Sequence, residues 1–342
     1  MWRCIAITCV SVFAACNNQK NTTDTAPAPS HVASTGDTTA SQKAPSPPPS
    51  QTETRRTTSS HRSEAVIPAP VSRKDIVAVS LLSPRSLSMK LRTKGGGIKV
   101  FKPLLEGDRR ARFEVAAYLV ANVLGLPGVP PAVIASLPLS LLQGRLAKDN
   151  RGVAERLAEE ALLDDRKWLA GAQIDWVADL DPAGIEKHGG LKTLKRWLHP
   201  ARPKDEYEPM LASSLSNTVV FDYLIGNWDR FSGGNLFINR AADRLILLDH
   251  NGSFAKWAGT REKRMNALLE NTQRFSKSFI DRIRRLKPEE IEQALALDPS
   301  HPHRPLLDKN QISLIMKRRD ELIAHVESLI KQKGTENIIV FE

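Results

Sequence analysis

Two aspartates and one asparagine lie at a spacing that phosphoryl transfer could use. They occur in residues 221–254, which read FDYLIGNWDRFSGGNLFINRAADRLILLDHNGSF. Phosphoryl transfer needs a carboxylate that orients the attacking hydroxyl group, and oxygen ligands for a divalent cation on the phosphates. Asp229 suits the first role. Asn235 and Asp249 suit the second, because amide and carboxylate oxygens are ligands for a divalent cation.

The elements around these residues would bring them together. Apolar residues at helical spacing lead up to Asp229, and short apolar runs at 236–238 and 245–248 predict two strands. Asp229 and Asp249 would then stand at the two chain ends of one hairpin, close in space. The alternative is that Asp229 and Arg230 form a surface ion pair and that 249–252 is an ordinary turn, because Asp, Asn and Gly dominate turns.

A second group of residues lies upstream. Residues 98–103 (IKVFKP) predict a strand with two lysines, and 112–124 predict an amphipathic helix with Glu114 in its first turn. A strand lysine paired with a helix glutamate fixes the nucleotide phosphates in kinases. Lys102 is favoured over Lys99, because proline marks the strand end beside Lys102, whereas a lysine at the strand start would be solvated. Glu114 alone would also fit a helix N-terminal acid that favours the macrodipole.

These segments, in this order, resemble a known family. FDYLIGNWDRFSGGNLF, LLDHNGSF, VFKPL and FEVAAYLVANVLGLPGVPPAVI are similar to the atypical secretory-pathway kinases of the Four-jointed type, the group that contains the Golgi casein kinase. The likeness extends from about residue 77 to about residue 334. It implies an α+β, bilobal protein-kinase-like fold with a small β-rich N-lobe and a mainly helical C-lobe.

The resemblance also implies roles for individual residues. Asp229 would be the catalytic aspartate, Asp249 the metal aspartate, Lys102 the nucleotide lysine, and Glu114 its acidic partner, which in this group also approaches the metal. Lys90 matches a second phosphate-facing lysine of the family; the alternative is an outward residue on an alternating strand.

The chain departs from the family pattern at three places. Phe231 stands where histidine is common, the loop to Asn235 carries an extra glycine, and the metal motif reads DHNG rather than DNG. These departures bear on Asn235 and Asn251 as ligands. Asp229 and Asp249 are retained, which argues against a degenerate pseudokinase.

The triglycine 95–97 resembles a phosphate cradle, but its position favours another interpretation. It joins two predicted strands, so a hairpin turn that uses glycine at positive φ is expected. A loop covering the phosphates would lie more naturally at 83–86, although that segment lacks glycine.

The N-terminus predicts export. A short basic start, an apolar run at 5–15 and small residues before Cys16 resemble a bacterial lipoprotein signal at 1–16, cleaved before a lipidated Cys16. An ordinary secretion signal is the alternative. All three cysteines lie in this region, so the remaining chain has no disulfide and no cysteine-based metal site.

The rest of the chain divides into a tether and a folded region. Residues 17–70 are rich in Ser, Thr, Pro and Ala, which predicts a disordered tether. Residues 71–342 predict one kinase-like domain, with an N-lobe at about 71–180 and a C-lobe at about 181–342. Within the N-lobe we expect strands at 76–82, 86–93, 98–103, 130–136 and 172–178, and a helix at 112–125.

The net charge of +11 does not predict a nucleic-acid reader, because aromatic residues make up only 6% and no groove-binding motif is present. We expect an exported, envelope-anchored phosphotransferase that uses ATP with Mg²⁺ or Mn²⁺. Its acceptor would be a protein Ser or Thr, or alternatively a sugar hydroxyl of a glycan. A hypothesis of another class is a surface lipoprotein that keeps the kinase fold as a catalytically silent binding module.

Overall fold

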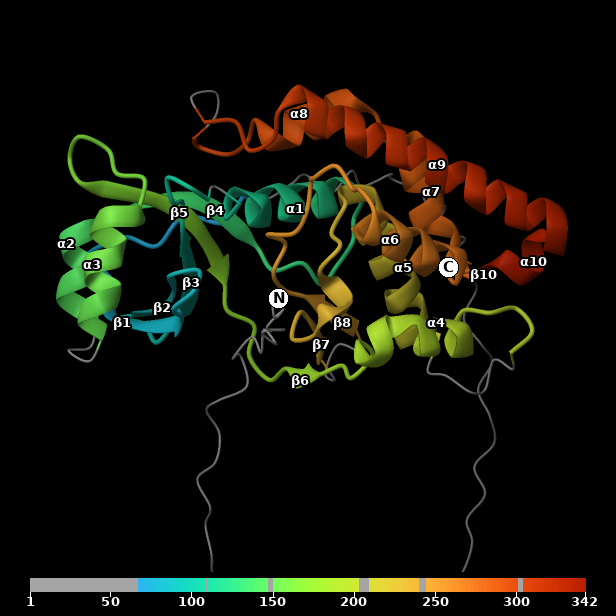
Figure 1. Cartoon of the computed structure of the whole chain (residues 1–342), viewed down its shortest axis with the longest axis horizontal. Coiled ribbons are helices and arrows are strands. Elements are labelled where there is room, and N and C mark those ends of the chain that lie inside the picture. The colour runs from blue at the N-terminus through green and yellow to red at the C-terminus, as the bar shows by residue number, and fades with distance from the viewer. Residues whose placement is uncertain (1–66, 109, 147–149, 203–208, 240–243, 301–303) are drawn as a thin grey trace, which may run out of the picture. The chain divides into compact units, whose positions relative to one another are not determined.

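The computed structural model describes residues 67–342, except 109, 147–149, 203–208, 240–243 and 301–303 (Figure 1). The predicted signal at 1–16, the predicted lipidation site Cys16 and nearly all of the tether at 17–70 lie outside the described residues. Among the described helices, none combines the length and the apolar character that crossing a bilayer requires.

The N-lobe is built on a five-stranded antiparallel sheet in the order β1-β2-β3-β5-β4. Its strands are β1 (Ile76–Ser83), β2 (Ser88–Thr93), β3 (Ile98–Pro103), β4 (Ala132–Pro138) and β5 (Trp168–Asp175). The first three match the expected strands closely. The last begins four residues earlier than predicted, because its first three residues pair with β4 beyond the end of its pairing with β3.

Side chains alternate between the two faces of this sheet, so each face packs against different helices. Phe101 and its cross-strand neighbours form one apolar core with α2 (Leu139–Arg145) and α3 (Arg151–Glu160). Val100 belongs to the larger core, which includes the predicted helix α1 (Arg112–Val123) and the C-lobe. Figure 1 shows α2 and α3 on one side of the sheet and α1 on the other. Neither α2 nor α3 was predicted from the sequence.

The C-lobe is mainly helical, as expected. Its helices are the 3₁₀ turn η2 (Lys187–Gly190), α4 (Leu191–Trp197), α5 (Pro209–Ile225), the 3₁₀ turn η4 (Arg230–Ser232), α6 (Thr260–Glu270), α7 (Lys277–Arg285), α8 (Pro288–Leu295), α9 (Lys309–Lys333) and α10 (Thr335–Ile338). Two small sheets complete it: β6 (Asp181–Pro182) with β7 (Leu236–Asn239) and β8 (Arg244–Leu247), and β9 (Phe275–Ser276) with β10 (Ile339–Phe341). The predicted hairpin is β7–β8.

The two lobes meet closely at the loop between α1 and β4. Gly128 has φ +100°, and a Cβ there would lie 2.3 Å from the carbonyl oxygen of Leu245. Its own carbonyl oxygen accepts a hydrogen bond from the amide of Leu247, at 2.9 Å. Only glycine permits both this conformation and this approach, so the hairpin that leads to Asp249 is held directly against the N-lobe.

The triglycine forms the predicted hairpin turn between β2 and β3. Gly96 has φ +78°, and its amide donates to the carbonyl of Thr93 at 3.0 Å. The glycines therefore serve the turn that sets the register of the lysine strand.

Candidate active site

Three predicted site residues meet in one cluster between the lobes. Alternation along β3 points Lys102 toward the face that α1 covers, where Glu114 occupies the first turn of the helix. The Lys102 Nζ atom lies 2.5 Å from Glu114 Oε1 and 3.3 Å from Asp249 Oδ1. Lys99, on the opposite face, pairs instead with Asp175 at a half-exposed position. The structure therefore brings Lys102, and not Lys99, to the carboxylates.

Burial and charge act in opposite directions on this cluster. Burial alone would lower the pKa of Lys102, but Asp249 and Glu114 outweigh it and raise that pKa. Burial alone would raise the pKa of Glu114, but the Lys102 ammonium and His250 outweigh it and lower that pKa. Lys102 and Glu114 are therefore both charged at neutral pH, with their positions fixed by ion pairing.

His250, the residue by which the metal motif departs from the family pattern, is a hydrogen-bond partner of Glu114. Its backbone amide donates to Glu114 Oε1 at 3.1 Å, and its Nδ1 atom lies 3.3 Å from Glu114 Oε2. The ring is buried, and burial lowers its pKa, with the nearby Arg230 acting in the same direction. A neutral imidazole that donates from Nδ1 fits this position. The extra residue in DHNG thus ties the metal motif to α1.

Asp249 lies two residues after the end of β8. It adopts φ +58°, a left-handed conformation that is uncommon for a residue other than glycine. Its Oδ1 atom accepts from Lys102 and from the amide of Asn251, at 3.3 Å in both cases. The side chain is 34% exposed, so a ligand can reach this carboxylate.

Asp229 and Asn235 occupy the adjoining loop. The Asn235 amide nitrogen donates to the carbonyl of Asp229 at 3.2 Å, so its amide oxygen is the atom that could serve a cation. Ser232 Oγ donates to Asp229 Oδ1 at 2.6 Å. A Cβ at Gly252 would lie 3.1 Å from the Asp229 Cβ, which shows that the DHNG segment packs against the Asp229 loop. Both predicted aspartates thus border one site.

Asn251 lies against the same cluster. When its amide is oriented to satisfy its neighbours, the nitrogen donates to Glu114 Oε1 at 3.2 Å and to the carbonyl of Arg110 at 3.3 Å. Asn251 therefore holds the N-lobe to the metal motif in this structure.

Further cations surround the carboxylates. Lys90 lies across β2–β3 from Val100, so it shares a sheet face with Lys102, and its Nζ lies 4.3 Å from the ring centroid of Trp176. Lys90 is half-buried, which does not match the alternative that its side chain points fully outward into solvent. On the C-lobe side, burial lowers the pKa of Arg264, while Asp229 acts to raise it. Arg264 was not among the predicted site residues.

The oxygen donors of this site fit Mg²⁺ or Mn²⁺. Among the described residues, no group of three or more His, Cys, Asp or Glu side chains is arranged as a complete metal cage. Mg²⁺ rarely uses such a cage in nucleotide enzymes, because it keeps several waters and binds one or two carboxylates plus substrate phosphates. Asp249, with the amide oxygen of Asn235, supplies ligands of that kind.

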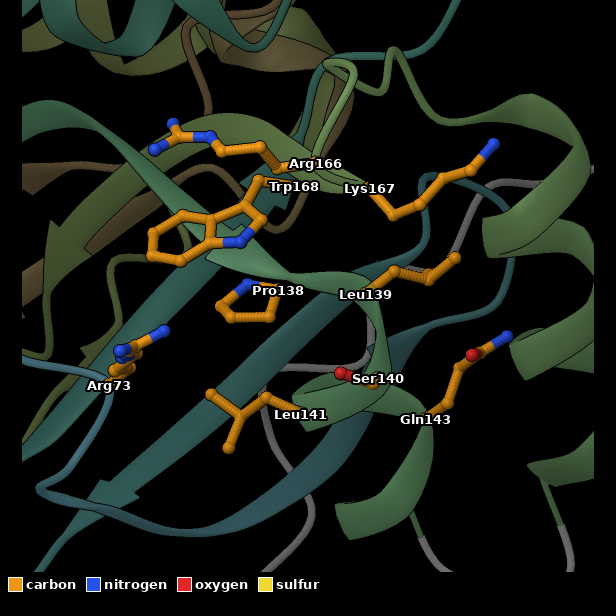
Figure 2. A pocket seen from close by; sticks show the side chains of 9 residues that line it. All are labelled: Arg73, Pro138, Leu139, Ser140, Leu141, Gln143, Arg166, Lys167 and Trp168. Atoms are coloured by element: carbon orange, nitrogen blue, oxygen red, sulfur yellow. The ribbon is translucent and has the colours of Figure 1, made fainter.

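A separate depression lies on the N-lobe, away from this cluster. It is lined by Arg73, Pro138, Leu139, Ser140, Leu141, Gln143, Arg166, Lys167 and Trp168. Figure 2 shows the Trp168 indole between the side chains of Arg73 and Arg166, whose guanidinium carbons lie 5.2 Å and 5.0 Å from its ring centroid. None of these residues belongs to the candidate active site.

Comparisons with known proteins agree with this geometry. The crystal structure of the Golgi casein kinase superimposes with a TM-score of 0.60 and 14% identity, covering 78% of this chain and 76% of that one. The chain shares a kinase-like fold. The hydra Fam20 structure with sugar gives a TM-score of 0.54 and 19% identity, over 78% of this chain and 89% of that one. A structure of the Golgi casein kinase with Mn and ADP bound gives a TM-score of 0.58.

Sequence comparison points to the same group. The human glycosaminoglycan xylosylkinase is 26% identical over 318 residues, covering 81% of this chain and 77% of that protein. The zebrafish (Danio rerio) glycosaminoglycan xylosylkinase is 26% identical over 186 residues, covering 50% of this chain and 45% of that protein. No protein-family model matches the chain. The resemblance to Four-jointed and Fam20-type kinases is therefore confirmed, and these homologues support a phosphotransferase that acts on a hydroxyl group.

Proposed function

We propose that the chain is an ATP-dependent phosphotransferase that transfers the γ-phosphoryl group to a hydroxyl group, with Mg²⁺ or Mn²⁺. The observation that carries this proposal is the buried Lys102 ammonium, which contacts Glu114 at 2.5 Å and Asp249 at 3.3 Å. A lysine held between a helix glutamate and a metal aspartate is the arrangement that positions nucleotide phosphates in kinases. The solved Golgi casein kinase complex with Mn and ADP supports the choice of cofactors.

Each residue has a defined role in the proposed reaction. Lys102 holds phosphate oxygens, and Lys90 on the same sheet face assists it. Asp229 orients the acceptor hydroxyl and takes its proton as the acceptor oxygen bonds to the γ-phosphorus. The bond from that phosphorus to the bridging oxygen breaks, and ADP leaves. A cation held by Asp249, with Asn235 or Glu114, would neutralise the phosphate charge.

Two acceptor classes fit the proposal. A protein Ser or Thr is the acceptor that we expected from the sequence, and the Golgi casein kinase shares the fold. A sugar hydroxyl is supported by the similarity to glycosaminoglycan xylosylkinase, which extends over 81% of the chain. Incubation with labelled ATP, Mn²⁺ and either a Ser/Thr peptide library or xylose-containing glycans separates the two classes by which pool becomes labelled.

We also propose that the protein is exported and anchored to the cell envelope by lipid on Cys16. The support is the sequence alone: an apolar run followed by small residues and cysteine at the N-terminus. Metabolic labelling with a fatty-acid analogue should mark the wild-type protein and not Cys16→Ser. Equal labelling of both would contradict the anchor.

The catalytic proposal is tested with two variants and labelled ATP. Asp229→Asn should abolish phosphoryl transfer but keep Mn²⁺-dependent nucleotide binding, because the amide keeps the shape and cannot accept the proton. Asp249→Ala should lose Mn²⁺-dependent stabilisation by ATP, which is about 2.7 kcal/mol when ATP is 100-fold above its Kd. Asp175→Ala, which removes the partner of Lys99 on the other face of β3, is the control and should keep both properties.

The outcomes also test the binding-module alternative. A wild-type protein that binds no nucleotide in the presence of Mg²⁺ or of Mn²⁺ would support the catalytically silent binding module. Unchanged stabilisation by ATP and Mn²⁺ in Asp249→Ala would contradict the metal assignment.

A further inference from the structure

One fully buried arginine contacts α5 and both ends of the β7–β8 hairpin. Arg230 follows Asp229 directly, and its side chain is 0% exposed. Its Nε and Nη2 atoms donate to the two carboxylate oxygens of Asp222, at 3.0 Å and 3.3 Å. Its Nη1 atom donates to the carbonyl of Asn235 at 2.8 Å and also to the carbonyl of Leu248. All three guanidinium nitrogens therefore donate hydrogen bonds, in directions that the planar group fixes.

The three acceptors of Arg230 belong to different segments around the candidate active site. Asp222 belongs to α5, Asn235 is a candidate metal ligand, and Leu248 immediately precedes Asp249. The network also closes on itself, because the amide of Leu248 donates to the carbonyl of Asn235 at 3.0 Å. The Asn235 side chain returns to the carbonyl of Asp229. One guanidinium therefore links the two ends of the hairpin and anchors both to α5.

The chemistry of the Arg230–Asp222 ion pair suits the positioning of the attached segments better than a gain in stability alone. Taking two charges out of water is expensive, and replacing a buried ion pair with well-packed apolar residues often leaves stability unchanged or raises it. A guanidinium, unlike an ammonium, holds several acceptors at fixed angles. Phosphoryl transfer is sensitive to such angles, since a displacement of about 1 Å can cost about 100-fold in rate.

We propose that Arg230 is a positioning residue that sets the separation between Asp229, which orients the acceptor, and Asp249, which holds the cation. This inference rests on the proposed phosphotransferase function. It assigns Arg230 no contact with substrate, because its side chain lies beneath the site and has no exposed surface.

The chain offers a matched control for this test. Arg274 is also buried, at 2% exposure, and donates to the carbonyls of Trp197 at 3.1 Å, Pro200 at 3.3 Å and Arg202 at 2.6 Å. These acceptors lie at and after the end of α4, away from Asp229 and Asp249. Arg274→Lys therefore removes a buried fork on backbone carbonyls without touching the proposed network.

The experiment compares Arg230→Lys, Arg274→Lys and wild type as full chains, at a temperature where urea unfolding shows that each is folded. Lysine keeps the charge beside Asp222 but cannot hold both carbonyls in one plane. Arg230→Lys should lower kcat for Mn²⁺-dependent phosphate release from ATP by about 100-fold. The KM for ATP should change by less than about threefold, as expected for a loss that is felt in the transition state.

A spectroscopic readout reports the geometry independently of turnover. The electron paramagnetic resonance spectrum of Mn²⁺ bound with ADP should change its zero-field splitting in Arg230→Lys and match wild type in Arg274→Lys. If Arg230→Lys does not fold, Asp222→Asn, which keeps the shape of the anchor and removes its charge, should show the same spectral change.

Each outcome decides the inference. A wild-type spectrum and kcat in Arg230→Lys would overturn the positioning role. Equal losses in Arg274→Lys would overturn it too, because they would trace to stability. A wild-type protein that binds Mn²⁺ and ADP while Arg230→Lys behaves identically refutes the positioning role alone. A wild-type protein that binds neither refutes the proposed function and the positioning role together.

Discussion

The two lysines of β3 form ion pairs that should contribute differently to stability, because one lysine is buried and the other is partly exposed. Lys102 is 8% exposed and contacts two carboxylates, whereas Lys99 is 22% exposed and contacts Asp175. A buried ion that loses its partner has no water to replace it. A partly exposed ion that loses its partner is hydrated instead. Removing the partner should therefore cost less stability at Lys99 than at Lys102.

Removing the carboxylate that pairs with each lysine measures that difference directly. Glu114→Ala leaves the Lys102 ammonium buried with Asp249 as its remaining partner, and should lower the free energy of unfolding by about 3–5 kcal/mol. Asp175→Ala should lower it by less than about 1 kcal/mol, because the Lys99 pair is partly exposed. Urea unfolding followed by circular dichroism gives both values. Similar values at the two sites would contradict the burial of the Lys102 cluster.

At the scale of elements, the site depends on where the β7–β8 hairpin is held. Its strands are only four residues each, so their own pairing stabilises them little. The backbone of Gly128 contacts β8 at Leu245 and Leu247, and Arg230 anchors both ends of the hairpin to α5. The hairpin is therefore positioned by contacts from both lobes.

Gly128→Ala should break one of these contacts. The conformation at φ +100° costs a non-glycine residue about 1–3 kcal/mol, and the new methyl group would also collide with the Leu245 carbonyl. Gly95→Ala is the control, because a Cβ there meets no atom within 4 Å and φ is not positive. Thermal unfolding should show a clear loss for Gly128→Ala and almost none for Gly95→Ala. An unaltered melting temperature in Gly128→Ala would mean that the loop and β8 are not in close contact.

At the scale of the whole molecule, ionic contacts join the lobes at the site. Lys102 and Glu114 come from the N-lobe, and Asp249 and His250 come from the C-lobe. Unfolding must separate these charges, so protonation of Glu114 is linked to global stability.

The sign of this linkage follows from the lowered pKa of Glu114, which results from Lys102 and His250 outweighing burial. The unfolded carboxyl titrates near 4.5, so the stabilisation is complete above that pH and declines as the pH falls toward the folded pKa. Glu114→Gln should lack this part of the acid-dependent loss. Urea unfolding at several pH values between 6 and about 3 tests it, and parallel pH curves for the two proteins would contradict the linkage.

The sequence by itself determined the order of the elements, and it pointed to Lys102, Glu114 and Asp249, which the structure brings together. Period-two and helical apolar patterns placed β1, β2, β3, α1 and the hairpin within a few residues, since these patterns follow from which face each element buries. The choice of Lys102 over Lys99 also came from strand position. The roles of Asp229, Asn235, Asp249 and Lys90 stay predictions until tested.

Only the tertiary structure showed what supports those residues. Arg230 was one half of a possible surface ion pair in the sequence, yet it is fully buried on Asp222. A carboxylate in the apolar stretch VVFDYL was the available signal, because a buried charge needs a partner. The partner eight residues on, the role of His250 at Glu114 and the approach of Gly128 to β8 were not readable. They depend on how separate elements pack against one another, and local sequence patterns do not encode those distances.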